Sequence, residues 1–500
     1  MCKMKKLLGS IVSDWSRLQR QMYVTNVVTP DIPVLPPTNH VARKYQGLDY
    51  DTVQKIKEAH VVPCIKSLNS KPLLINEAHM QWIYDHTGKR YLDMFAGIVT
   101  VSVGHCHPRV TEAAKSQLDK LLHCSNLFQH STMYEYTKKL VKTLPPHLNV
   151  IYLVNSGSEA NELAILLARL YTKKQDVIAF NSAYHGGTHL TQTLTALATY
   201  KYPRNNAPGI HHAMMPDVYR GIWGGARCRY SPIQTKRYCE CPPNQCDATN
   251  KFYEQLVNAF QYNVPITGAA ALIAESIQGV AGVKEFPRYF LRKAYEMIKS
   301  TDGLFISDEV QTGFGRTGDN FWGFEMHGVS PDIVTMAKGI ANGLPMGAVA
   351  TTTEIAQVLT KASHFNTFGG NPVSCAAASA VLDVIKDEEL QANCKEVGTY
   401  LLTQLSKLRD QFEIVGDVRG KGLMIGVDLV QNKETRVPLN SRHMSHILDS
   451  CKDIGLILGR GGLSGNVIRI KPPMCVTMED AKFTYDVLHH VLTKFQNKKL

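Results

Sequence analysis

The sequence predicts an α/β protein in which helices pack against a mostly parallel sheet. Three short apolar runs have the length and β-branched content of buried strands: residues 151–154, 304–307 and 333–336. The first run leads through a turn into the stretch SEANELAILLARLYT, whose leucines recur at helical spacing. Because 500 residues exceed what one core usually holds, we expect two or more subdomains.

The composition is that of a globular protein, with 44% hydrophobic and 20% charged residues. No apolar run reaches the length of a membrane span, so we expect no membrane association. No basic run is interleaved with aromatic residues, so we expect no nucleic-acid partner. The net charge of +12 either steers anionic substrates such as oxo acids or reflects a generally basic surface.

The N-terminal segment has the composition of a targeting sequence. Residues 1–25 are basic, contain few acidic residues and place apolar residues at helical spacing. Residues 29–40 are rich in proline, which is typical of an extended linker. We therefore expect residues 1–40 to be a transit peptide and linker, and the protein to reside in the mitochondrial matrix. The alternative for the first segment is a disordered basic tail.

Two of the predicted strands end in residues that carry chemistry. One run is followed by Asp308, and another is followed, one residue later, by Lys338. If the two strands are close in one parallel sheet, both ends reach its carboxyl edge, where open α/β sheets bind ligands. A lysine and a carboxylate in one crevice suit pyridoxal phosphate, which needs an amine for covalent attachment and an anion for its ring nitrogen. Taken alone, each residue is equally compatible with a solvated turn.

A third strand end has the features of a phosphate site. The strand at residues 151–154 runs into Asn155-Ser156-Gly157-Ser158 and then into a helix. Such a turn offers free backbone N–H groups and the positive end of a helix dipole. The turn at Gly157 and Ser158 therefore suits a phosphate group, although an ordinary capped helix would show the same pattern.

The stretches DEVQTGFGRTG, from Asp308, and MAKGIANGLPMGA, around Lys338, are long and specific. Both resemble the class III (subgroup II) aminotransferases of the fold-type I pyridoxal-phosphate enzymes, and the resemblance covers roughly residues 60–490. It implies a large domain with a mostly parallel seven-stranded sheet and a smaller α+β domain. The expected boundaries are 41–110 for the N-terminal part of the small domain, 111–374 for the large cofactor-binding domain and 375–500 for the C-terminal small domain.

The resemblance also assigns roles around the cofactor. Lys338 would carry it and Asp308 would keep its pyridine nitrogen protonated, so these two are the expected catalytic residues. The ring would lie between Tyr184 and Val310, with Gln311 on its phenolic oxygen. The resemblance implies the following cofactor-binding residues: Gly157, Ser158, Tyr184, His185, Glu275, Asp308, Val310, Gln311, Lys338 and Thr367. Glu275 is expected to support the Asp308 region through hydrogen bonds.

One of these residues implies a particular assembly. Thr367 lies in the stretch HFNTFGGNP, and in the resembling family this threonine reaches the neighbouring subunit's cofactor phosphate. We therefore expect an obligate homodimer with composite sites. The sequence leaves open whether dimers pair into a homotetramer.

Substrate choice is expected to depend on Arg469, which would hold the substrate α-carboxylate as a bidentate pair. Family members that alternate an ω-amine with glutamate mask this arginine with a glutamate, where this sequence has Val280. An open Arg469 favours small acids such as alanine, glyoxylate and pyruvate. Ile98 and Gly187 stand where the ornithine enzyme has a tyrosine and an arginine, so we expect Ile98 to border the substrate and ornithine not to be used.

The predicted activity is therefore ping-pong transamination between small amino and oxo acids. Two alternatives stay open. One is an ω-amino-acid:pyruvate aminotransferase, and the other is an inactive relative that acts as a binding protein. Intact Lys338, Asp308 and Arg469 argue against the inactive relative.

The cysteine usage includes one unusual cluster. Twelve cysteines without a secretory signal indicate reduced thiols. Cys228, Cys239, Cys241 and Cys246 crowd one predicted loop, where they could bind zinc or oxidise in pairs. Their spacing lacks the paired CxxC of zinc knuckles. The sequence therefore favours free thiols and no metal.

Overall fold

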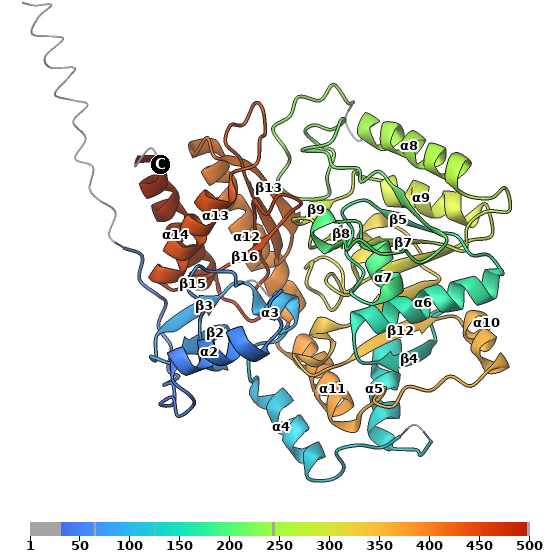
Figure 1. Cartoon of the computed structure of the whole chain (residues 1–500), viewed down its shortest axis with the longest axis horizontal. Coiled ribbons are helices and arrows are strands. Elements are labelled where there is room, and N and C mark those ends of the chain that lie inside the picture. The colour runs from blue at the N-terminus through green and yellow to red at the C-terminus, as the bar shows by residue number, and fades with distance from the viewer. Residues whose placement is uncertain (1–31, 65–66, 126, 243–245, 498–500) are drawn as a thin grey trace, which may run out of the picture.

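The computed structural model describes residues 32–64, 67–125, 127–242 and 246–497 (Figure 1). The predicted transit peptide, residues 1–25, lies outside the described residues. In the part of the chain that the structure describes, no helix is both long and apolar enough to cross a membrane.

A seven-stranded sheet forms the centre of the larger part of the molecule, in the order β4-β12-β11-β10-β7-β5-β6. Only β12 runs antiparallel to its neighbours, and the other strands are parallel to one another. The predicted mostly parallel seven-stranded sheet is therefore confirmed. Its strands are β4 (Val150–Val154), β5 (Val177–Phe180), β6 (Ile210–Ala213), β7 (Ala271–Glu275), β10 (Leu304–Asp308), β11 (Ile333–Met336) and β12 (Gly347–Thr351).

Helices cover both faces of this sheet because its strands are apolar on both sides. Phe305 and Val334 belong to one hydrophobic cluster, whereas Ile306 and Ile333 belong to another. Successive side chains of a strand point to opposite faces, so the two clusters lie on the two sides. The second cluster contains the apolar face of α6 (Gly157–Thr172), and the first contains that of α9 (Phe290–Lys299).

The register of three central strands brings their carboxyl ends together. β10 is hydrogen-bonded to both β7 and β11, and Asp308 lies opposite Glu275 on one side and Thr335 on the other. β11 ends two residues before Lys338. The strands expected at 304–307 and 333–336 are thus confirmed as direct neighbours in one parallel sheet.

Two smaller sheets lie beside the large one (Figure 1). The first has the order β1-β2-β3-β15, and the second has the order β13-β14-β17-β16. Their strands are β1 (Ile75–His79), β2 (Trp82–Asp85), β3 (Arg90–Asp93), β13 (Val415–Lys421), β14 (Met424–Leu429), β15 (Leu456–Ile457), β16 (Gly459–Gly461) and β17 (Val467–Ile470). A separate hairpin consists of β8 (Ile277–Gln278) and β9 (Lys284–Glu285).

The pairing of β15 with β3 joins the beginning of the described chain to its end. We propose on this basis that the segments 41–110 and 375–500 form one small domain, with 111–374 as the large domain. The boundary expected after residue 374 falls inside α11, because that helix begins at Pro372, directly after its N-cap Asn371.

The remaining helices pack around the three sheets. They are α2 (Tyr50–His60), α3 (Ala96–Val99), α4 (Pro108–Leu118), α5 (Ser131–Val141), α7 (His189–Leu194), α8 (Asp247–Asn263), α10 (Thr353–Ala356), α11 (Pro372–Asp387), α12 (Leu390–Gln411), α13 (Ser441–Ile454) and α14 (Met478–Asn497). Short 3-10 turns are η1 (Ala198–Tyr200), η2 (Gly323–His327), η3 (Lys338–Ala341) and η4 (Gln357–Lys361).

Candidate active site

A cavity of about 300 Å³ lies at the carboxyl edge of the large sheet. The residues that line it come from strand ends, the start of α6 and the turns that follow β11. Among them are the predicted residues Gly157, Ser158, Tyr184, His185, Glu275, Asp308, Val310, Gln311 and Lys338. Of the predicted site residues, Thr367, Arg469 and Ile98 do not line this cavity.

Asp308 is held by hydrogen bonds on both carboxylate oxygens. Its Oδ2 accepts from His185 Nδ1 at 2.7 Å and from Asn161 Nδ2 at 2.9 Å, and its Oδ1 accepts from the Val310 backbone at 3.1 Å. Asn161 is fixed in turn by Thr335, whose hydroxyl donates to Asn161 Oδ1 at 2.7 Å. These contacts hold a buried carboxylate in a fixed orientation at the wall of the cavity.

Asn161 is a site residue that the sequence reasoning missed. It sits one turn into α6, on the buried face of the helix. Its amide also donates to the backbone oxygen of His185 at 2.8 Å, so one side chain orients both Asp308 and His185. A buried asparagine among the leucines and alanines of α6 was the available signal, because a polar group at such a position must find partners.

Lys338 follows β11 in a strained backbone conformation. Its φ of 48° lies in the left-handed region, which a lysine rarely adopts. Burial lowers the pKa of the Lys338 amine, while the nearby carboxylates of Asp308 and Glu275 oppose that shift. Strain of this kind persists only where surrounding structure enforces it, as active sites do. The lysine is thus aimed into the cavity with its neutral form favoured.

The start of α6 forms the end of the cavity suited to an anion. Ser156 caps the helix by accepting from the Glu159 backbone, and Gly157 and Ser158 form the first turn, whose N–H groups have no acceptor within the helix. A Cβ on Gly157 would lie 3.1 Å from a methyl group of Val310 and 3.6 Å from Ala337. Glycine therefore lets this turn pack closely against Val310, and the free N–H groups leave it suited to a phosphate, which remains a prediction.

Glu275 contributes in a different way from the one expected. Its two oxygens accept from the backbone N–H groups of Tyr184 at 3.0 Å and Gly279 at 2.8 Å, and Asp308 is not among its hydrogen-bond partners. Burial raises the pKa of Glu275. Its bonds fix the backbone of Tyr184, whose ring lines the cavity and contacts Tyr200, with ring centroids 4.9 Å apart.

Arg469 lies on β17 beside the cavity rather than in its wall. Its Nε donates to the backbone oxygen of Arg460 at 3.0 Å, and its guanidinium sits 5.1 Å from the centre of the Phe95 ring. Nη1 is buried and has no partner among the described residues. Burial lowers the pKa of Arg469 to about 10, so the side chain remains charged at neutral pH. An unpartnered buried cation of this kind is a ready site for a carboxylate.

The expected absence of a masking carboxylate can be examined at Val280. Its backbone oxygen accepts from Gly462 at 3.0 Å, which places Val280 against the strand turn next to Arg469. Among the described residues, Arg469 takes part in no ion pair within 4 Å. The valine side chain can supply no such pair, so the guanidinium is open.

Lys471, two residues beyond Arg469, was also missed from the sequence. It is fully buried, and its Nζ donates to Gln311 Oε1 at 2.8 Å and to the Gly279 backbone oxygen at 3.3 Å. Burial holds the pKa of this amine well below its usual value. Because Oε1 of Gln311 accepts from Lys471, the amide N–H groups are left for other partners. A lysine in the apolar run NVIRIKPPM was the only signal in the sequence.

The two remaining predicted residues face solvent. Thr367 is exposed, in the loop before α11. Ile98 is 43% exposed and has a φ of 62°, and the cavity is bordered instead by Thr100 from the same segment. Neither residue touches the cavity of its own chain.

The donor set of the cavity fits pyridoxal phosphate. The cavity wall holds an anchored carboxylate, free helix amides and an amine with a lowered pKa. His185 Nε2 is buried with no partner among the described residues. Unsatisfied buried groups of this kind are costly unless a ligand completes them.

Comparisons with known proteins agree with this site. Residues 65–492 match the family described as Aminotransferase class-III. The human protein "Alanine--glyoxylate aminotransferase 2, mitochondrial" is 50% identical over 95% of this chain and 93% of its own length. "Alanine--glyoxylate aminotransferase 2 homolog 2, mitochondrial" from Arabidopsis thaliana is 43% identical over 92% of this chain and 91% of its own.

A solved structure extends the agreement to three dimensions. An amine transaminase from an uncultivated Pseudomonas species, in its PLP-bound form, superposes with a TM-score of 0.75 at 30% identity, covering 85% of this chain and 95% of that one. The chain belongs to the class III aminotransferases. It is therefore a transaminase of the pyridoxal-phosphate-dependent class, and the predicted fold-type I architecture and cofactor are confirmed.

Proposed function

We propose that the enzyme moves an amino group from alanine, or from a small β-amino acid such as 3-aminoisobutyrate, to glyoxylate or pyruvate by a ping-pong mechanism. The observation that carries the proposal is the open guanidinium of Arg469, which Val280 leaves unmasked. The names of the human and Arabidopsis relatives, both alanine–glyoxylate aminotransferases, support the same substrates.

The cavity at the carboxyl edge of the large sheet would hold the cofactor. When bound, pyridoxal phosphate supplies a ring that withdraws electrons from the amino-bearing carbon of the substrate. Asp308 would hold a proton on the ring nitrogen, and His185 and Asn161 keep that carboxylate in place. Gly157 and Ser158 would bind the phosphate through backbone N–H groups.

Lys338 would then act as the general base. Its buried amine has a lowered pKa, so more of it is neutral at physiological pH than of an exposed lysine. A neutral Nζ can accept the proton that leaves the amino-bearing carbon and deliver it again on the same face. No other described lysine lines the cavity.

Arg469 would select the substrate through its carboxylate. The planar guanidinium can bind a carboxylate in a bidentate manner, and its backbone is fixed because β17 pairs with β14 on one side and β16 on the other. We place Ile98 at the outer border of this substrate region.

We further propose that the enzyme is a homodimer in which Thr367 completes the partner's phosphate site. Thr367 is exposed, and its loop carries the exposed rings of Phe365 and Phe368. Phe368 also contacts His123, so exposed aromatic rings stand on both sides of the threonine in the sequence. Such a surface suits a second copy of this chain. We leave open the pairing of dimers into tetramers, and we propose the mitochondrial matrix as the location.

The test is the absorption spectrum of the purified enzyme with its cofactor. Alanine is expected to bleach the visible band of the bound cofactor, and glyoxylate is expected to restore it. Lys338→Ala, the control, should show neither change. If alanine leaves the band unchanged and an ω-amine bleaches it, the enzyme is an ω-amino-acid:pyruvate aminotransferase. If the wild type binds no cofactor at all, the chain is an inactive binding relative.

A further inference from the structure

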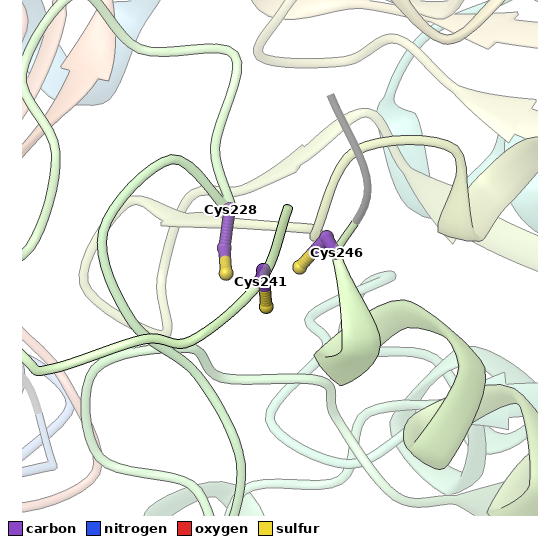
Figure 2. Close-up of side chains that lie close together, drawn as sticks. All are labelled: Cys228, Cys241 and Cys246. Atoms are coloured by element: carbon purple, nitrogen blue, oxygen red, sulfur yellow. The ribbon is translucent and has the colours of Figure 1, made fainter. Parts of the chain in front are cut away.

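The segment between β6 and α8 brings the side chains of three cysteines together (Figure 2). The sulfur atoms of Cys228, Cys241 and Cys246 all lie within 4.8 Å of one another. Cys228 and Cys246 are buried, and Cys241 is half-buried. None of the three lines the cofactor cavity, so the cluster is separate from the active site.

The three side chains are held in place by hydrogen bonds and by the start of a helix. The backbone oxygen of Cys228 accepts from the Arg288 N–H at 2.9 Å. Cys246 is the N-cap residue of α8, a helix of 17 residues that packs on β6. The Cys241 sulfur accepts from the Asp247 N–H at 3.3 Å. The three thiols thus meet at one point on two anchored parts of the chain, the backbone at Cys228 and the start of α8.

We propose that this cluster binds a soft divalent cation, zinc, through Cys228, Cys241 and Cys246, with Cys239 as the fourth ligand. Zinc–sulfur bonds of 2.3 Å in a tetrahedron place the sulfur atoms about 3.8 Å apart. The present separations, up to 4.8 Å, therefore need to close by no more than about 1 Å. Each thiol releases its proton to solvent as the ion binds, so no oxidant is required.

Cys239 is placed to complete the set. Its sulfur accepts from the backbone N–H of Cys241 at 3.4 Å, so it lies beside one member of the cluster and would move toward the other two as the ion binds. Backbone N–H groups that donate to sulfur are what a thiolate-bound metal needs around it. Cys246 at the start of α8 also lies at the positive end of a long helix, which stabilises a thiolate.

A disulfide is the competing use of these thiols. It would join only two sulfurs and would leave the third buried beside them, whereas an ion uses the mutual contact of all three. The sequence alone favoured free thiols because no CxxC pair is present. In the folded chain, the proposed ligands are instead brought together from positions 228, 241 and 246.

The position of the cluster indicates a structural role. The segment that it closes also carries Arg229, which is fully buried against Asp417 of β13 at 2.8 Å, and Arg220, which pairs with Asp428 of β14 at 2.6 Å. These ion pairs connect the segment that follows β6 to the smaller sheet that contains β13 and β14. A metal at the cysteines would fix the segment that presents both arginines, so its loss should lower stability rather than abolish the chemistry.

The test measures metal in the purified holoenzyme. Elemental analysis is expected to give about one zinc per chain in the wild type, and at least tenfold less in Cys241→Ser. Cys106→Ser, at an exposed cysteine outside the cluster, is the matched control and should keep its zinc. Cobalt substituted for zinc should give thiolate charge-transfer absorption in the wild type and the control. Chelation should lower the thermal midpoint of both by several degrees.

Defined outcomes would overturn the proposal. Wild-type protein that binds neither zinc nor cobalt, with all thiols reactive, leaves free cysteines as the answer. A mass lower by one pair of hydrogens under non-reducing conditions identifies a disulfide instead. For the fourth ligand, Cys239→Ser should bind zinc at least about tenfold more weakly. If it behaves as the wild type does, the four-thiolate assignment is wrong.

Discussion

Two buried charged groups of the proposed active site, the carboxylate of Asp308 and the guanidinium of Arg469, differ in how many hydrogen-bond partners they have. The carboxylate of Asp308 receives three hydrogen bonds from fixed donors, so its orientation is set before any ligand arrives. The guanidinium of Arg469 is equally buried, yet its Nη1 has no partner among the described residues. A permanent cofactor benefits from a preorganised anion, whereas an exchangeable substrate needs a cation that is still open. The number of hydrogen-bond partners that each charged group already has thus indicates whether it binds the cofactor or the substrate.

The largest effect is expected where the satisfied charge is removed. Asp308→Asn keeps the size of the side chain but removes the anion, so kcat/KM should fall about 10³-fold, as for loss of a preorganised electrostatic contact. The measurement is steady-state transamination together with cofactor retention. Asp302→Asn, in an exposed turn before the same strand, is the control and should retain wild-type rates. A fall of less than tenfold for Asp308→Asn would contradict the role of this carboxylate.

The next effect concerns the open charge. Arg469→Lys should raise KM for alanine about 100-fold, because an ammonium cannot form the bidentate pair. An amine donor without a carboxylate should keep its kinetics. Arg460→Lys is a matched control, since Arg460 lies on the adjacent strand but already donates to Gly465 and Ser441. Equal effects of Arg469→Lys on both kinds of donor would mean that this arginine supports the fold instead of the substrate.

The same rule can be tested away from the site, at Glu285. Its Oε2 accepts from the Gly420 backbone, but its buried Oε1 has no partner among the described residues. Burial raises the pKa of Glu285 to about 7, from 4.5 in the unfolded chain. Between these values the folded state keeps a proton that the unfolded state releases. The free energy of unfolding should therefore decrease by about 2 kcal/mol as pH rises from 5 to 8.

Glu285→Gln isolates this contribution, because the amide keeps the shape and cannot ionise. Denaturant unfolding at both pH values is the measurement, and the variant should lose about 2 kcal/mol of the wild-type pH dependence. The same pH dependence in both proteins would place Glu285 among the fully satisfied carboxylates.

The smallest effect is expected at Lys471, a positioning residue. Lys471→Met should lower kcat about tenfold with little change in KM, because Gln311 loses the contact that orients its amide. The absorption maximum of the bound cofactor and its pH dependence should shift as well, which a purely structural change would not cause. Lys471→Arg is expected to restore part of both. Unaltered spectra in Lys471→Met would separate this lysine from the site.

The sequence by itself determined the strand ends and what they carry. The runs before Asp308 and Lys338 are apolar on both faces, so they had to be buried strands, and parallel strands end at one edge. The turn at Gly157 could also be predicted, because the strand, the glycine and the helix follow one another directly in the sequence. The sequence was therefore sufficient to predict a structural feature wherever all of its residues lie within one short motif.

Only the tertiary structure decided the features that depend on contacts between distant segments. Asn161 and Thr335 meet 174 residues apart, and Lys471 reaches Gln311 across 160. Nη1 of Arg469 is unpartnered because no described acceptor lies within hydrogen-bond reach of it. The cysteine cluster forms because the loop between β6 and α8 folds so that its thiols meet. Side-chain types and periodicity report which residues are buried, but the partners that satisfy a buried polar group are fixed by packing alone.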